Sequence, residues 1–149
     1  MIERIHVITR GQERLENVTV HVQRAVRRLN IDQGLCHLFV PHTTAGIIVN
    51  ESADPDVTRD ILERLEALAP RGGRYHHAEG NAHAHIKAAL VGQSVTIPIE
   101  GGKLGLGRYQ GIFLAEFDGP RERTVVVNVT VTAATSLKEM LPEEFRDKL

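Results

Sequence analysis

Apolar and polar residues alternate at the start of the chain and then change to a helical period. Residues 2–9 alternate loosely, which is typical of an opening strand. From Asn17 to Leu29 the apolar residues recur every three or four positions with arginines between them, which predicts an amphipathic helix that Asn17 caps. The β-branched residues at 18–20 favour extended structure and oppose the helix at its start.

Two apolar runs in the middle of the chain predict strands, and each leads into polar residues. The run at 35–40 has the length of a buried strand and stops at a proline, which places His42 at a strand end. A second strand is predicted at 45–50. Asp54 is followed by a proline, a combination that starts helices, and we expect a helix from there to about Leu68.

Glycine-rich turns divide the second half of the chain. We expect a short helix over 83–91 with Asn81 as its cap, and a charged amphipathic segment over 136–149. Between them, β-branched and apolar runs predict strands at 94–99, 111–117 and 124–132. The total of about six strands and about three helices, without a repeat or a linker, describes a single compact α+β domain over residues 1–149.

Composition and charge exclude several classes of protein. With 149 residues, of which 42% are hydrophobic and 25% are charged, the chain matches a soluble globular domain rather than a disordered or fibrous protein. The net charge of −1 gives no general attraction to nucleic acid or to an anionic membrane. We therefore expect neither of these as a partner.

The single cysteine and the start of the chain indicate a compartment. Cys36 lies in an apolar run and has no second cysteine to pair with, so we expect a reducing environment. Met1 opens without the basic start and apolar stretch of a secretory signal, and no apolar run reaches the ~20 residues that span a bilayer. The expected location is cytoplasmic.

The segment 75–87 holds four of the chain's eight histidines beside Glu79 and Asn81. Neutral imidazole is the commonest metal-binding side chain, and a catalytic zinc needs three protein ligands with an open fourth position. If this segment meets the end of the strand at 35–40, the predicted metal ligands are His42, His77 and His85. Glu79 and Asn81 can orient these imidazoles or bind a harder cation such as Mg²⁺. A single histidine is more often an ordinary surface residue, but a cluster beside a carboxylate favours a bound metal or anion.

Three further segments offer groups that bind phosphate. Thr43 and Thr44 supply hydroxyls and exposed backbone donors, although threonine is also an ordinary strand residue. Residues 101–108 are rich in glycine and carry two cations, which predicts either a phosphate cradle or a hairpin loop. The turn at 118–123 brings two arginines together. One interpretation is that Arg121 binds phosphate there. The other is that the turn is solvated and its second arginine pairs with a glutamate across the ladder.

Three long blocks of the sequence form a set. They are PHTTAGIIVNESADPDV at 41–57, YHHAEGNAHAHIKAALVGQS at 75–94 and GGKLGLGRYQGIFLAEFDGPRER at 101–123. In this order and at these separations they resemble the signature blocks of the YjbQ family, whose members are often called secondary thiamine-phosphate synthases. The resemblance extends over nearly the whole chain.

The resemblance implies a compact α+β subunit with a β-sandwich-like core, which assembles as a homotrimer and brings the histidine blocks into a polar pocket near a subunit boundary. It also implies a weak thiamine-phosphate synthase activity, which joins hydroxymethylpyrimidine diphosphate to thiazole phosphate and releases pyrophosphate. The family's motif positions fall on His42, Thr43, Thr44, Asn50, Glu51, Asp54, His77, Glu79, Asn81, His85, Gln110, Glu116 and Arg121. The chain departs from the family at Tyr109, where Trp is frequent, and at His83, where an acid is frequent, and both bear on the pocket's packing and metal preference.

The leading hypothesis is a transferase in which a divalent metal, Zn²⁺ or Mg²⁺, neutralises the diphosphate leaving group of a phosphorylated substrate. The predicted catalytic residues are Glu51, Glu79 and Asn81. The predicted phosphate-binding residues are Thr43, Thr44 and Arg121. Two other interpretations stay open: a metal-assisted phosphohydrolase with a bound water as the nucleophile, and a non-enzymatic trimer that binds a small ligand or a metal.

Overall fold

Two antiparallel sheets form the centre of the protein in the computed structural model, which describes residues 1–132 and 142–148. In the order of hydrogen-bonded neighbours, one described sheet runs β1-β8-β3-β5-β6 and the other runs β2-β7-β4. The strands are β1 Ile2–Ile8, β2 Arg14–Asn17, β3 Gly34–Phe39, β4 Ala45–Glu51, β5 Ser94–Glu100, β6 Lys103–Leu104, β7 Gln110–Glu116 and β8 Glu122–Val131. The prediction of an α+β fold with a sandwich-like core is confirmed.

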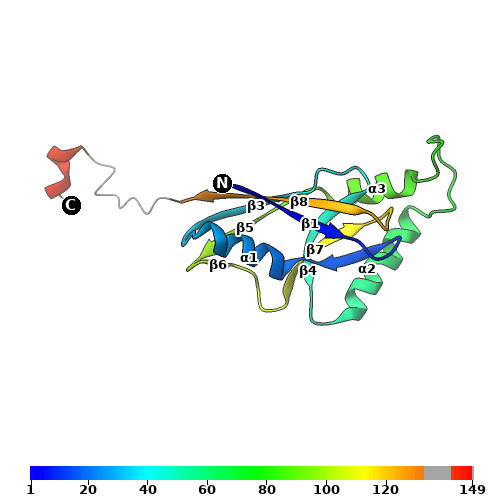
Figure 1. Cartoon of the computed structure of the whole chain (residues 1–149), viewed down its shortest axis with the longest axis horizontal. Coiled ribbons are helices and arrows are strands. Elements are labelled where there is room, and N and C mark those ends of the chain that lie inside the picture. Colours follow the sequence, from blue (N-terminus) through cyan, green and yellow to red (C-terminus); the bar gives the residue numbers. More distant parts are fainter. Residues whose placement is uncertain (133–141, 149) are drawn as a thin grey trace.

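The helices α1 Thr19–Leu29, α2 Pro55–Leu68 and α3 Ala82–Val91 lie against these sheets in the described part of the chain (Figure 1). The 3-10 helix η1 Glu143–Lys148 lies apart from them. Helices α2 and α3 lie at the end of the molecule opposite β6. No helix within 1–132 and 142–148 is long and apolar enough to cross a membrane. The predicted amphipathic segment at 136–149 lies partly outside the described residues.

One hydrophobic core lies between the two sheets and beneath α1. Strand β3 buries every second residue, including Cys36 and Leu38, because successive side chains of a strand point to opposite faces. Ile47 of β4 and Leu114 of β7 enter the same core from the other sheet, and α1 adds Val22. Burial raises the pKa of the Cys36 thiol to about 11, which makes Cys36 an inert core residue, as its apolar neighbours predict.

The elements that carry local signals begin and end close to the predicted positions. Asp54 caps α2 by accepting a hydrogen bond from the N–H of Asp56 at 2.9 Å. The two strands that the pattern does not predict are the polar, four-residue β2 and the two-residue β6. The hairpin interpretation of residues 101–108 is confirmed, because β6 pairs with β5 across Gly101 and Gly102, whose φ angles are 57° and 72°.

Asn81 occupies the N-cap position of α3, but its side chain makes no capping hydrogen bond. Its Nδ2 atom instead donates to Oδ2 of Asp118 at 3.0 Å. The prediction that the Asn81 side chain caps this helix is therefore wrong. The bond to the Asp118 carboxylate orients the Asn81 amide, and Oδ1, the atom that would accept a capping bond, is buried without a hydrogen-bond partner in the described chain.

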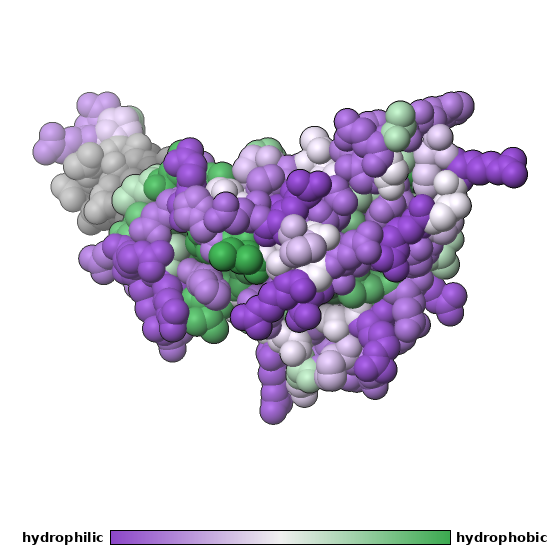
Figure 2. All heavy atoms as spheres, turned by 45° about the vertical axis from the view of Figure 1, so that its right-hand side comes forward, coloured by the Kyte–Doolittle hydropathy of each residue, from purple (hydrophilic) through white to green (hydrophobic). Residues whose placement is uncertain are grey.

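The outer face of the five-stranded sheet is not covered by any described helix or strand. Leu35 and Phe39 of β3 are 47% and 43% exposed on this face. The view in Figure 2 is largely hydrophilic, with hydrophobic residues gathered on the left half of the molecule. His37 lies between Leu35 and Phe39 and is exposed on the same face. Large apolar side chains in contact with water are a feature of proteins that associate.

The contact between α3 and β4 leaves no room for a side chain at Gly46. A Cβ there would lie 2.5 Å from the carbonyl oxygen of Gly92 and 2.5 Å from Cγ2 of Val91. We expect Gly46→Ala to lower the free energy of unfolding by about 1–3 kcal/mol, measured by denaturant titration. Gly72→Ala is the control, since a Cβ at Gly72 meets nothing within 4 Å. Equal losses in the two variants would contradict this packing.

Candidate functional site

Three distant segments meet where β4 begins, β7 turns into β8, and α3 begins; we call this place the β7–β8 corner. The carbonyl oxygen of Thr44, just before β4, accepts a hydrogen bond from the N–H of Phe117 at 3.2 Å. Asn81, just before α3, reaches the same turn through its bond to Asp118. The corner therefore brings together parts of all three sequence blocks that carry the predicted site.

A buried ion pair lies at the centre of this corner. Glu116 is fully buried and accepts two hydrogen bonds from Arg123, from Nε to Oε1 at 2.8 Å and from Nη2 to Oε2 at 2.5 Å. The Thr9 hydroxyl donates to Oε1 at 2.8 Å, and the N–H of Asp118 donates to Oε2 at 3.1 Å. Arg123 also donates from Nη2 to Oγ1 of Thr44 at 2.8 Å. Both carboxylate oxygens and two nitrogens of the guanidinium are therefore engaged, which offsets the cost of burying the two charges.

These contacts set the charge of Glu116. Burial alone would raise the pKa of its carboxyl, but the hydrogen bonds from Arg123, Thr9 and the Asp118 backbone outweigh burial and hold the pKa below its ordinary value. Glu116 is therefore an anion at neutral pH. It serves as an anchor for the corner rather than as a proton donor.

Arg121 lies on the exposed side of the same corner. Its Nε donates to the carbonyl oxygen of Asp118 at 2.7 Å, and its Nη2 donates to Oδ2 of Asp118 at 3.1 Å. The hydrogen bonds from Asn81 and Arg121 lower the pKa of the Asp118 carboxyl, against burial, which would raise it. Asn81 Oδ1 is buried and has no hydrogen-bond partner within the described chain. The guanidinium is thus oriented by Asp118 and still offers donors to solvent.

His77 and His85 are neighbours, as the clustering in the sequence predicts. Their rings meet edge to face with the centroids 5.3 Å apart. Oε2 of Glu79 lies 3.6 Å from Nε2 of His77. His85 lies in the first turn of α3, and its N–H bonds to the carbonyl oxygen of Asn81 at 3.4 Å. His85 therefore lies one helical turn after Asn81, whose amide touches the β7–β8 corner, and His77 lies against the ring of His85.

The ring of His42 accepts a hydrogen bond from the backbone. Its Nε2 accepts a hydrogen bond from the N–H of Thr124 at 2.9 Å, so the ring is neutral at this nitrogen and carries its proton on Nδ1. Burial, with the nearby Arg123 guanidinium, lowers the pKa of His42 and keeps the ring neutral. The Nε2 lone pair is thus used by the protein itself.

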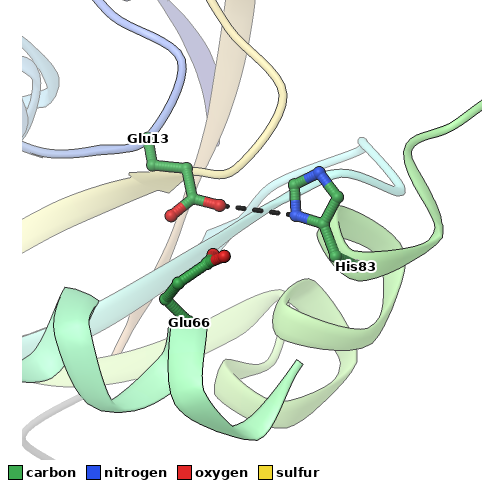
Figure 3. A group of neighbouring side chains, drawn as sticks. All are labelled: Glu13, Glu66 and His83. Carbon is green, nitrogen blue, oxygen red and sulfur yellow. Dashed lines mark ion pairs between the residues drawn. The ribbon is translucent and has the colours of Figure 1, made fainter. Parts of the chain in front are cut away.

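The described residues do not bring the three predicted histidines into one set of ligand atoms. Within 1–132 and 142–148, the one group of three such residues whose ligand atoms all lie within 4.8 Å is Glu13, Glu66 and His83. Figure 3 shows these side chains pointing toward one another from the loop before β2, from α2 and from α3.

A lysine fills the centre of this second cluster. Nζ of Lys87 lies 2.6 Å from Glu13 Oε1, 2.5 Å from Glu66 Oε2 and 3.3 Å from Nδ1 of His83. Lys87 is fully buried, so its ammonium takes the position that a metal cation would need. Because Lys87 already neutralises the two carboxylates, we assign Glu13, Glu66 and His83 to structure and not to a metal site.

The two remaining predicted residues lie apart from these contacts. Thr43 is exposed, and its hydroxyl makes no hydrogen bond within the described chain. Glu51 is paired with Gln110 at one end of β4, whereas Ala45 is paired with Glu116 at the other end. Six residues of extended strand separate the two ends by roughly 20 Å. Glu51 therefore lies outside the β7–β8 corner of its own chain.

Sequence reasoning missed Thr9 and Asp118 as residues that hold the corner together. For the turn at 118–123, the alternative in which the second arginine pairs with a glutamate across the ladder is confirmed, since Arg123 pairs with Glu116, although both side chains are buried rather than solvated. Thr9 follows β1, and its role depends on the pairing of β1 with β8, which no local pattern reveals. Asp118 bonds within its own turn to Glu116 and Arg121, so its role is local.

Comparison with known proteins gives a consistent result along the sequence. Residues 3–132 match the family described as UPF0047 protein YjbQ-like. UPF0047 protein MJ1081 of Methanocaldococcus jannaschii is 45% identical over 129 residues, which are 87% of this chain and 94% of that protein. UPF0047 protein YugU of Bacillus subtilis is 38% identical over 130 residues, covering 87% of this chain and 98% of that protein.

Solved structures agree with the sequence matches. A protein of the yjbq/upf0047 family from Clostridium acetobutylicum is 49% identical, with a TM-score of 0.84 over 86% of this chain and 99% of that one. A YbjQ-like protein of unknown function from Sulfolobus solfataricus is 35% identical, with a TM-score of 0.85 over 89% of this chain and 97% of that one. These relatives share the fold described above, and their descriptions assign no activity.

The ion pair between Glu116 and Arg123 makes a prediction about stability. Arg123→Met leaves a buried, uncompensated carboxylate, and we expect it to lower the free energy of unfolding by about 3–5 kcal/mol at neutral pH. Arg121→Met, which removes an exposed guanidinium from the same turn, should cost less than about 1 kcal/mol. Urea titration of both variants measures the difference, and comparable losses would show that burial of the pair is unimportant.

The same pair fixes the direction of the pH dependence. Because the folded pKa of Glu116 is depressed, its stabilising contribution is present above the ordinary carboxyl pKa and is lost as the pH falls through the folded value. The difference in the free energy of unfolding between wild type and Arg123→Met should therefore narrow in acid, where protonation of Glu116 removes the unpaired charge.

Proposed function

The chain belongs to the UPF0047 YjbQ-like family, and on that premise we propose that it is a transferase of the secondary thiamine-phosphate synthase type. It would join hydroxymethylpyrimidine diphosphate to thiazole phosphate and release pyrophosphate. The observation that carries the proposal is the placement of Arg121 beside Asn81, one helical turn from the imidazoles of His77 and His85. In this proposal, the cationic donors of Arg121 and the imidazoles act on one substrate.

Arg121 is the phosphate-binding group in this proposal. Asp118 holds two of its nitrogens, which fixes the orientation of the guanidinium before a substrate binds. Guanidinium donors bind phosphate oxygens strongly, and a preoriented cation stabilises the charge that develops on a departing diphosphate. The exposed hydroxyl of Thr43 is a second donor, while Thr44 is used internally by Arg123.

The proposed divalent metal is assigned to the imidazole pair. Oε2 of Glu79 lies 3.6 Å from Nε2 of His77 and would orient the ring when a metal is bound, as carboxylates do for metal-binding histidines. His77 and His85 would supply two ligands, and the phosphate oxygens of the substrate would supply others. His42 is a weaker ligand in this arrangement, because its Nε2 accepts a hydrogen bond from Thr124. When bound, the metal would neutralise the diphosphate.

A phosphohydrolase is the second candidate, because the imidazole pair is open to water. The side chains of His77 and Glu79 are 43% and 76% exposed. A transferase that proceeds through a cationic intermediate has to exclude water, since water would capture that intermediate. One subunit provides little cover over His77, which favours hydrolysis unless a neighbouring subunit or the substrate closes the site.

A homotrimer is part of the proposal for this reason. The outer face of the five-stranded sheet exposes Leu35 and Phe39, and association would bury them. Glu51 also needs a neighbour, since it lies at the far end of β4 from the β7–β8 corner. In a closed ring, one end of each subunit can meet the opposite end of the next subunit.

The activity is tested with wild type, His85→Ala and Arg121→Gln, each supplied with both precursors. We expect thiamine phosphate and pyrophosphate in equal amounts from wild type, and a loss of about tenfold to hundredfold in both variants. Elemental analysis should show less bound divalent metal in His85→Ala only. His21→Ala, which changes an exposed histidine of α1, is the matched control and should retain both metal and activity.

Other outcomes separate the candidates. Phosphate release from the diphosphate precursor without the thiazole partner would assign a hydrolase. Saturable binding of either precursor without any turnover would assign a non-enzymatic binding protein.

The assembly is tested by sedimentation equilibrium. We expect wild type to have three times the mass of one chain. Phe39→Glu should dissociate, because it places a charge on the sheet face that the trimer would bury. Leu68→Glu introduces the same charge at a residue of α2 that is 72% exposed and should leave the mass unchanged. A monomeric wild type would remove the trimer from the proposal.

A further inference from the structure

A second surface, away from the β7–β8 corner, collects positive charge. Arg24 and Arg27 of α1 and Lys103 of β6 form no ion pair with any described residue, whereas Arg28 of the same helix pairs with Glu3 at 2.7 Å. The whole chain has a net charge of −1, so this concentration of cations is not a general property of the surface. Permanent charges without partners on one face are available to an external anion.

Two recesses open along this face, and we call them together the α1–β6 groove. One has a volume of about 420 Å³ and is lined by Arg24 and Arg27, and the other has a volume of about 250 Å³ and is lined by Arg27 and Lys103. No carboxylate lines either recess. The larger one falls within the ~300–1,000 Å³ range typical of small-molecule sites.

The walls of the groove are held in place by one side chain. Nε2 of Gln23 donates to the carbonyl oxygen of Gly102 at 3.1 Å, and Oε1 of Gln23 accepts from the N–H of Leu104 at 3.0 Å. These two bonds fix α1 against β6 (Figure 1). The recesses are therefore part of the packed structure and do not require a loop to move.

The larger recess also has an apolar wall. Val20 is 59% exposed at its edge, and Leu104 and Leu106 are partly buried beneath it. An apolar wall beside unpaired cations matches a molecule that has an anionic head and an apolar body. An inorganic ion would leave the apolar wall in water, and an uncharged molecule would leave the arginines unused.

From this we propose that the α1–β6 groove binds a small organic anion with an apolar tail, through Arg24 and Arg27 at the head and Val20, Leu104 and Leu106 at the tail. The groove shares no lining residue with the proposed transferase site, so the inference does not rest on that function. Helix α1 and β6 lie away from α3, the helix to which His85 belongs (Figure 1). The ligand would occupy an independent site on the same chain.

The test uses octyl phosphate as the probe, in isothermal titration calorimetry with the full chain. We expect saturable binding with one site per chain and a loss of about tenfold or more in Arg27→Gln, which removes the cation shared by both recesses. Val20→Glu should lose binding as well, because it adds an opposing charge at the edge. Arg28→Gln, one position further along the helix and outside the groove, is the matched control and should bind as wild type does.

Several results would overturn the proposal. Inorganic phosphate binding as tightly as octyl phosphate would show that the apolar wall is not used. Octyltrimethylammonium binding equally well would show that the cations are not used. A fall in the mass of Val20→Glu by sedimentation would identify the groove as a contact between copies of the chain. Thermal unfolding of each variant shows that lost binding does not come from lost folding.

Discussion

The buried pair of Glu116 and Arg123 is the interaction on which the corner of this fold depends. Glu116 ends β7 of one sheet and Arg123 lies near the start of β8 of the other, so their bidentate contact joins the two sheets. A charge this deeply buried is stable only if all its hydrogen-bonding groups are satisfied. Thr9 and the Asp118 backbone complete the carboxylate, and Thr44 accepts a further hydrogen bond from the guanidinium.

This pair determines the geometry of the exposed residues around it. The N–H of Asp118 is held by Glu116, and Asp118 in turn holds both Arg121 and Asn81. Glu116, a fully buried anion, thus positions the exposed Arg121 and the start of α3 through the carboxylate of Asp118. The second buried charge, Lys87 with Glu13 and Glu66, fixes the middle of α3 against α2 and the loop before β2. Between these two anchors the helix presents His85 at a defined place.

The sequence was informative where the signal is local. The cap of α2 depends on Asp54 and a neighbouring proline, and the buried strands depend on runs of apolar residues, so the pattern predicts both within a residue or two. The sequence was uninformative where the partners are distant along the chain. Lys87 has the pattern of an ordinary helical lysine, and its partner Glu13 lies 74 positions away. The clustering of His77 and His85 was predictable because both lie in one short segment. The use of His42 by a backbone N–H was not, since it depends on how β8 lies next to the end of β3.

The position of Glu51 carries the strongest argument about assembly. Residues that the family resemblance predicts as motif positions lie at both ends of the β4 and β7 pair, with Thr44 and Glu116 at one end and Glu51 and Gln110 at the other. An extended, hydrogen-bonded ladder cannot shorten, so no movement within a subunit brings these ends together. If Glu51 takes part in the same chemistry as Arg121, it does so across a boundary between chains. The uncovered face of the five-stranded sheet gives such a boundary a physical cause, because association removes its apolar residues from water.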